Sequence, residues 1–136
     1  MREAILQQIN LVRAGGFVCG TQLLPAATAV AWNDVLFSAA ARHSQDMAAR
    51  NYFSHTTPEG VDFAQRLASE GYSGWIEGEN IAAGLGSVAT VMSTWMGSEG
   101  HCQNIMQPQF REVAVACVMR PGTTYGTYWS MELGAR

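Results

Sequence analysis

The side chains that could do chemistry gather in three short segments of the sequence. These segments are Tyr52–His55, Gly78–Ala82 and Trp95–His101, the last followed by Asn104–Met106. An imidazole changes its charge near neutral pH and can ligate a metal, and a carboxylate can pair with the imidazole or share that metal. His55, Glu79 and His101 are therefore the residues from which a candidate site is built.

Other chemistries find less support in the sequence. Ser54 and Ser98 each stand near a histidine, but neither lies in the strand-turn-helix elbow that presents a nucleophilic serine. Gly84–Gly86 is too short and poorly placed for a dinucleotide-binding loop. His43 falls on the apolar stripe of a helix, so we expect a packed histidine with one satisfied hydrogen bond and leave it out of the site.

Four segments have the apolar spacing of helices that could position these residues. They are residues 2–12, residues 34–50 with Asn33 or Asp34 as the cap, a short helix from Phe63 that ends before Gly71, and residues 88–96 capped by Ser87. The segments 19–29 and 71–86 show no clear period and are predicted as irregular loops. Glu79 is thereby expected on a loop, and His55 just beyond the end of a helix.

The C-terminal third has the composition of antiparallel strands. Residues 113–119 and 124–133 are rich in β-branched and aromatic side chains, with Pro121–Gly122 between them as a turn. Helices that come first and strands that come last indicate an α+β fold rather than parallel βαβ units.

The cysteine count is odd, so one thiol stays outside any internal disulfide. Residues 101–106 could form a further strand or a short helix. If they form a strand, a hairpin centred near Gln109 brings Cys102 opposite Cys117, in a register that allows a disulfide. We therefore predict a Cys102–Cys117 bridge with Cys19 free.

The composition limits both the fold and the partners. The chain of 136 residues is 48% hydrophobic and 14% charged, which is enough apolar surface for one folded core. A net charge of -3, with basic residues scattered singly, gives no concentrated positive field for a phosphate backbone, so no nucleic acid partner is expected. No apolar run approaches the roughly 20 residues that span a bilayer, so the chain is not expected to cross a membrane.

The three segments, taken together with others in the same order, resemble the CAP superfamily of cysteine-rich secretory, antigen 5 and pathogenesis-related proteins. The other matching pieces are Asn10–Arg13, Ser44–Ala48 and Tyr128–Trp129. The likeness covers nearly the whole chain and is closest to the bacterial single-domain form, often called SCP-like. It implies that residues 1–136 form one domain, a three-layer α-β-α sandwich with a central, mainly antiparallel sheet.

The resemblance also implies a cleft lined by two histidines and two acids, which in relatives can hold a divalent metal. Carried over by motif, His55, His101 and Glu79 would be three of these residues. Two neutral imidazoles and a carboxylate suit zinc and leave one position open. An alternative is that Glu79 lies between the two histidines and joins the loops by charge-assisted hydrogen bonds without a metal.

The second acid of this cleft does not carry over directly. Ser98 stands where larger relatives have the acid, while Glu99 beside it and Glu77 near Glu79 are both candidates. Asn80 is expected to brace the segment around Glu79 through hydrogen bonds to backbone, and Ser98 is taken with it as support for the cleft.

Three classes of function follow from the resemblance. The first is a secreted or extracytoplasmic binding domain that takes a divalent metal, a small ligand or a lipid-like ligand. The second is a metal-dependent hydrolase with Glu77 or Glu99 as the base, and the third is a structural or cell-wall interaction module without catalysis. The missing second acid argues against an enzyme, and a monomer is expected.

Overall fold

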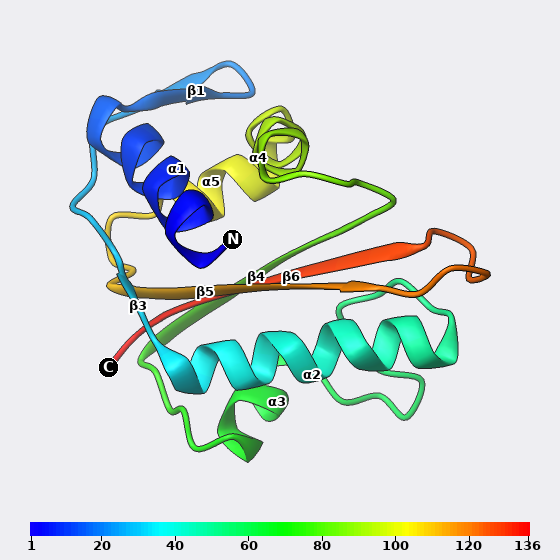
Figure 1. Cartoon of the computed structure of the whole chain (residues 1–136). Coiled ribbons are helices and arrows are strands. Elements are labelled where there is room, and N and C mark those ends of the chain that lie inside the picture. Colours follow the sequence, from blue (N-terminus) through cyan, green and yellow to red (C-terminus); the bar gives the residue numbers. More distant parts are fainter.

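The computed structural model describes residues 1–136 and places a four-stranded sheet between two layers of helices (Figure 1). Along the chain the elements are α1 (Arg2–Gly15), β1 (Phe17–Cys19), β2 (Gln22–Leu24), β3 (Ala31–Trp32), α2 (Asp34–Arg50), α3 (Phe63–Ser69), β4 (Ile76–Ala83), α4 (Val88–Met96), α5 (Glu99–Met106), β5 (Glu112–Met119) and β6 (Thr127–Ala135). Helices α1, α4 and α5 cover one face of the sheet, and α2 and α3 cover the other (Figure 1). None of the helices is long and apolar enough to cross a membrane.

The main sheet has the strand order β3-β5-β6-β4. Strand β6 lies between β5 and β4 and is antiparallel to both, whereas the two-residue strand β3 pairs with β5 in parallel. Strands β1 and β2 form a separate antiparallel hairpin. The α+β prediction of a three-layer sandwich around a mainly antiparallel sheet is confirmed.

Helix α2 begins and ends where its sequence predicts. The side chain of Asn33 accepts hydrogen bonds from the backbone N–H groups of Val35 and Leu36, each at 2.9 Å, which caps the first turn. Asn51 closes the helix in the left-handed conformation, with φ of 52°. His43 is 1% exposed on the buried stripe, and its Nε2 donates to the carbonyl of Ser54 at 2.9 Å, as expected for a packed histidine.

Two predictions of irregular structure are wrong. Residues 71–86 were expected to form a loop, yet Ile76–Ala83 is strand β4, paired over eight residues with β6. Side chains from the helices satisfy its outer edge, because Trp95 Nε1 donates to the Ile81 carbonyl at 3.0 Å and Asn104 Nδ2 to the Glu79 carbonyl at 3.2 Å. Segment 19–29 likewise starts within the β1–β2 hairpin.

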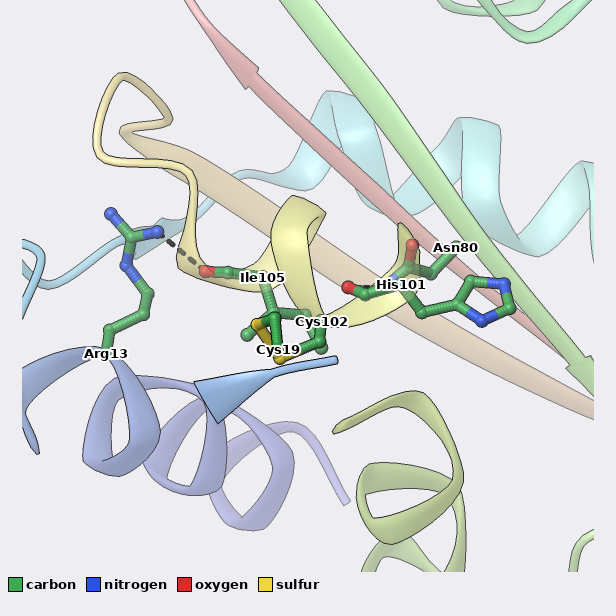
Figure 2. Close-up of a disulfide and its surroundings, with 6 residues drawn as sticks. All are labelled: Arg13, Cys19, Asn80, His101, Cys102 and Ile105. Carbon is green, nitrogen blue, oxygen red and sulfur yellow. Dashed lines mark hydrogen bonds between the residues drawn. A yellow bond between two sulfur atoms is a disulfide. The ribbon is translucent and has the colours of Figure 1, made fainter. Parts of the chain in front are cut away.

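The predicted Cys102–Cys117 disulfide is also wrong. Residues 101–106 belong to helix α5, which was the alternative to a strand, so the expected hairpin does not exist. Cys102 faces the β1–β2 hairpin and is bonded to Cys19, with 5.5 Å between the two Cα atoms (Figure 2). Cys117 lies on β5 opposite Trp129 of β6 and is the free cysteine.

The two faces of the sheet are packed differently. A cluster of 18 buried apolar residues fills the space between the sheet and helices α1, α4 and α5. The α2 side has two smaller apolar clusters, of five and four residues. Along β6, Trp129, Met131 and Leu133 join the large cluster, whereas Ser130 points to α2, where its hydroxyl lies 2.8 Å from that of Ser44. Because side chains alternate along a strand, Glu132 lies on the same polar face as Ser130.

Candidate functional site

A polar cleft of about 420 Å³ opens between the loop before α3, strand β4 and helix α5. Its eight lining residues are His55, Thr56, Asp62, Phe63, Glu77, Gly78, Glu79 and Asn104, of which only Phe63 is hydrophobic. Gly78 lies in the wall of the cleft and packs closely against Phe110. A Cβ at this position would lie only 2.8 Å from the Phe110 ring, so a larger residue would not fit. The cleft therefore suits a polar occupant better than an apolar one.

The centre of the cleft is the pair of His55 and Glu79. His55 Nδ1 lies 2.8 Å from Glu79 Oε1, and the glutamate side chain is fully buried while the histidine is half exposed. An ionised carboxylate can only accept a hydrogen bond, so Nδ1 carries the proton and Nε2 of the neutral ring is left as an acceptor. Strand β4 and the loop before α3 are thus joined through a histidine of fixed tautomer.

Arg66 of helix α3 holds this pair from behind. Its Nη2 donates to Glu79 Oε2 at 2.7 Å and to the His55 carbonyl at 2.8 Å. Its Nη1 lies 3.4 Å from Oε1 of Glu132, a residue of β6 that pairs directly with Glu79 of β4. The loop before α3 and strands β4 and β6 are therefore joined by one guanidinium group.

The two neighbouring carboxyl groups differ in their protonation. Burial raises the pKa of Glu132 well above its ordinary value. A hydrogen bond to Glu79 and the negative charge of Glu79 raise it further. Burial alone would also raise the pKa of Glu79, but hydrogen bonds from Glu132 and His55 and the charge of Arg66 hold that pKa at about 2. The pKa values of the two carboxyl groups are therefore driven apart: Glu79 ionises first, and Glu132 holds its proton to higher pH.

His101 is near this group without joining it. It lies in the first turn of α5, its backbone carbonyl accepts from Asn80 Nδ2 at 3.0 Å, and its buried Nδ1 has no hydrogen-bond partner. Burial and the charge of His55 lower its pKa. In Figure 2 its ring projects from α5 on the side away from the disulfide. The structure thus brings His55 and Glu79 into contact, and His101 is not among the lining residues.

The two candidate second acids lie in different places. Glu77 lines the cleft and accepts a hydrogen bond from the backbone N–H of Gly74 at 3.0 Å. Glu99 lies against the β1–β2 turn, where its carboxylate carbon is 2.8 Å from the position that a Cβ on Gly20 would occupy. Glu77 therefore lines the cleft, as Asp62 does, whereas Glu99 lies outside it.

The predicted support residues have separate roles. Asn80 braces α5 against β4, because it donates to the His101 carbonyl and its Oδ1 accepts from Asn104 Nδ2 at 2.9 Å. Ser98 precedes α5 as its cap residue, but its hydroxyl makes no capping hydrogen bond.

Helix α5 is fixed from its other side by a buried cation. Arg13 is fully buried and donates to the carbonyls of Thr28, Ile105, Gln107 and Phe110 at 2.8 to 3.3 Å. Figure 2 shows the bond to Ile105. Burial lowers its pKa, and these four carbonyls take the place of a counter-ion. Together with the disulfide, Arg13 sets the position of the helix that carries His101 and Asn104.

The side chains as they stand do not fit a metal. No three histidine, cysteine, aspartate or glutamate side chains form a group that could hold a metal ion. Both oxygens of Glu79 are already engaged, by His55 and by Arg66. The positive charge of Arg66 beside that carboxylate also opposes a second cation.

Sequence reasoning missed Arg66 and Glu132. Glu132 is a lone acid in an otherwise apolar strand, and a buried acid of this kind requires a partner. Arg66 precedes the inward-facing Leu67 of a short helix, a position typical of a solvated side chain. An acid within an apolar strand was therefore a signal by which the sequence could have pointed to Glu132. No comparable signal pointed to Arg66.

Comparison with known proteins gives a consistent result. A model of the cysteine-rich secretory protein family, CAP, matches residues 6–133. The uncharacterized Bacillus subtilis protein YkwD is 35% identical over 100 residues, which are 74% of this chain and 37% of that protein. The chain therefore spans little more than a third of that relative.

Solved structures share the fold. An extracellular protein of Bacillus anthracis containing an SCP domain superposes with a TM-score of 0.81 at 25% identity, over 99% of this chain and 40% of that one. An outer surface protein of Borrelia burgdorferi gives 0.82 at 16% identity, over 98% and 91% of the two chains. The second likeness concerns the fold alone.

Proposed function

Because the chain belongs to the cysteine-rich secretory protein family, CAP, we propose that it is an extracytoplasmic binding domain whose cleft takes a small polar ligand. The observation that carries this proposal is the cleft of about 420 Å³ beside the buried His55–Glu79 pair, lined by a single hydrophobic residue. Residues 1–136 would act as one domain of this kind, and as a monomer.

Two observations support the location outside the cytoplasm. The Cys19–Cys102 bridge is of a kind that persists in oxidising compartments and is rare in the cytosol. The Bacillus anthracis protein of the same fold is described as extracellular.

The lining favours a ligand that donates hydrogen bonds. His55 Nε2 and the carboxylates of Asp62 and Glu77 are acceptors, and the guanidinium of Arg66 is already engaged by Glu79, Glu132 and the His55 carbonyl. Hydroxyl or ammonium groups, as in an amino sugar, match such a surface. A lipid-like ligand finds only Phe63, and metal-dependent hydrolysis finds no free set of ligands.

The experiment is a titration of the ¹⁵N-labelled chain with glucosamine, glucose and octanoate, followed by amide and imidazole shifts. We expect saturable shifts around His55, Glu77 and Asn104 with glucosamine, smaller ones with glucose and none with octanoate. Glu77→Gln should weaken glucosamine binding about tenfold, the scale of one lost charge-assisted hydrogen bond. Glu99→Gln removes an equal charge outside the cleft and should have no effect.

The outcomes separate the candidate functions. Octanoate shifts at Phe63 with none from the sugars would contradict the polar ligand and favour a lipid. If none of the three compounds shifts the resonances of the cleft residues, the result would favour an interaction module that works through its surface.

A further inference from the structure

A cation lies directly behind the cleft. Arg66 contacts Glu79 at 2.7 Å and Glu132 at 3.4 Å, and these two acids are direct partners on neighbouring strands. The side chain of Arg66 is 12% exposed, and those of both acids are fully buried. The buried, ionised carboxylate of Glu79 needs a partner of opposite charge, and here that partner comes from helix α3.

The same guanidinium also sets the geometry of the His55–Glu79 pair. With Oε2 of Glu79 directed to Arg66, the other oxygen, Oε1, meets His55 Nδ1 at 2.8 Å. The second bond of Arg66 Nη2, to the His55 carbonyl, holds the loop that carries the histidine. Arg66 thus contacts the pair at both of its ends, and it does so without lining the cleft.

Arg66 occupies the carboxylate oxygen that a divalent metal would need as a ligand. The lone pairs of Glu79 Oε2 face the guanidinium, and a second cation placed on that carboxylate would lie close to a fixed positive charge. Glu79 cannot turn toward a metal without giving up its ion pair with Arg66, whose side chain is only 12% exposed.

We infer that Arg66 is a positioning residue that replaces a metal in this cleft: it orients Glu79 toward His55 and excludes divalent cations from the pair. Its removal should therefore create a metal site, in which Glu79, Glu132 and His55 become available as ligands. The inference concerns the same cleft as the proposed function but does not depend on any ligand.

The test is zinc titration by calorimetry on metal-stripped protein. The parent and Arg66→Lys, which keeps the positive charge, should show no saturable binding. The neutral variants Arg66→Met and Arg66→Gln should gain saturable binding of one zinc per chain, since the repelling charge is gone. Arg42→Met is the matched control, because Arg42 forms an ion pair with Glu70 rather than with the cleft acids, and it should behave as the parent.

Two further variants decide the interpretation. Adding Glu79→Gln to Arg66→Met should abolish the new binding, which assigns the site to the cleft. Stoichiometric zinc binding by the parent that is lost in His55→Ala would overturn the inference, and so would folded neutral variants that gain no zinc affinity. Failure of the glucosamine titration would leave both of these results intact, so the two proposals fail separately.

Discussion

The two faces of the sheet have different contents. Toward α1, α4 and α5 the sheet packs the cluster of 18 buried apolar residues, and this layer also contains the disulfide. Toward α2 and α3 the apolar clusters have five and four members, and His43, Ser44, Ser130, Glu79 and Glu132 are buried on this side. Adjacent residues of β4 and β6 serve the two faces in alternation, so one strand contributes both to stability and to the cleft.

The two faces therefore contribute differently to the stability of the fold. Apolar burial on the first face provides the driving force of folding. The polar groups on the second face add less net stability, and His43 Nδ1, Arg66 Nε and Glu132 Oε2 have no hydrogen-bond partner there. Substitutions on the two faces should therefore differ in size, and on the polar face also in sign.

The largest loss is expected at Trp95, which is fully buried in the large cluster and donates to the Ile81 carbonyl. Trp95→Ala should lower the free energy of unfolding by about 3–5 kcal/mol, since it removes a large core side chain and leaves a cavity. Trp75, which is 65% exposed, is the control, and Trp75→Ala should stay within about 0.5 kcal/mol. Urea unfolding measures both, and equal losses would contradict the assignment of the core.

The disulfide should come next. Replacing Cys19 and Cys102 by alanine should cost about 2–4 kcal/mol, because the bridge closes a long loop in the unfolded chain. Cys117→Ala, the control, should cost less. Thiol titration of the denatured, unreduced parent should find one thiol per chain, and none after Cys117→Ala; a thiol that survives that change would refute the pairing.

Glu79→Gln should cost about 1–3 kcal/mol at neutral pH, because Arg66 and His55 lose their charged partner. The pKa of Glu79 is held at about 2, below its ordinary 4.5, so its contribution to stability is present above about pH 4.5 and is lost as the pH falls toward 2. The difference in the free energy of unfolding between parent and variant should therefore shrink as the pH falls from about 4.5 toward 2, measured by unfolding at a series of pH values. A deficit that is constant with pH would contradict the ionised state.

Glu132→Gln should have the smallest effect, under about 1 kcal/mol, and the opposite sign. The pKa of Glu132 is raised by burial, so its contribution to stability is complete below its ordinary pKa of 4.5 and is lost as the pH rises. The variant should therefore be slightly more stable than the parent at neutral pH and equal to it in acid. Destabilisation at neutral pH would show that Glu132 is ionised in the folded protein.

Local patterns predicted most of the fold. The stripe and cap of α2, the cap of α4 and the β-branched residues of β5 and β6 act over a few residues, and the structure confirms them. Strand β4 was missed because its Gly78-Glu79-Asn80 core has little intrinsic strand preference and is ordered by side chains from α4 and α5. The disulfide was mispaired because that prediction depended on a strand at residues 101–106.

The site was predictable only in part. His55 and Glu79 came from the resemblance and are in contact, while His101 forms no hydrogen bond to either through its buried Nδ1. Arg66 and Glu132 were missed because their roles depend on the register between β4 and β6 and on the docking of α3, which are long-range contacts. A sequence read locally has no access to such pairings.

The most direct test of the His55–Glu79–Arg66 arrangement is a long-range ¹H–¹⁵N correlation of the His55 ring in mildly alkaline solution, before and after zinc is added. We expect the proton on Nδ1, a bare Nε2 and no change with zinc. A proton on Nε2, or ring nitrogen shifts that saturate at one zinc per chain, would contradict the arrangement.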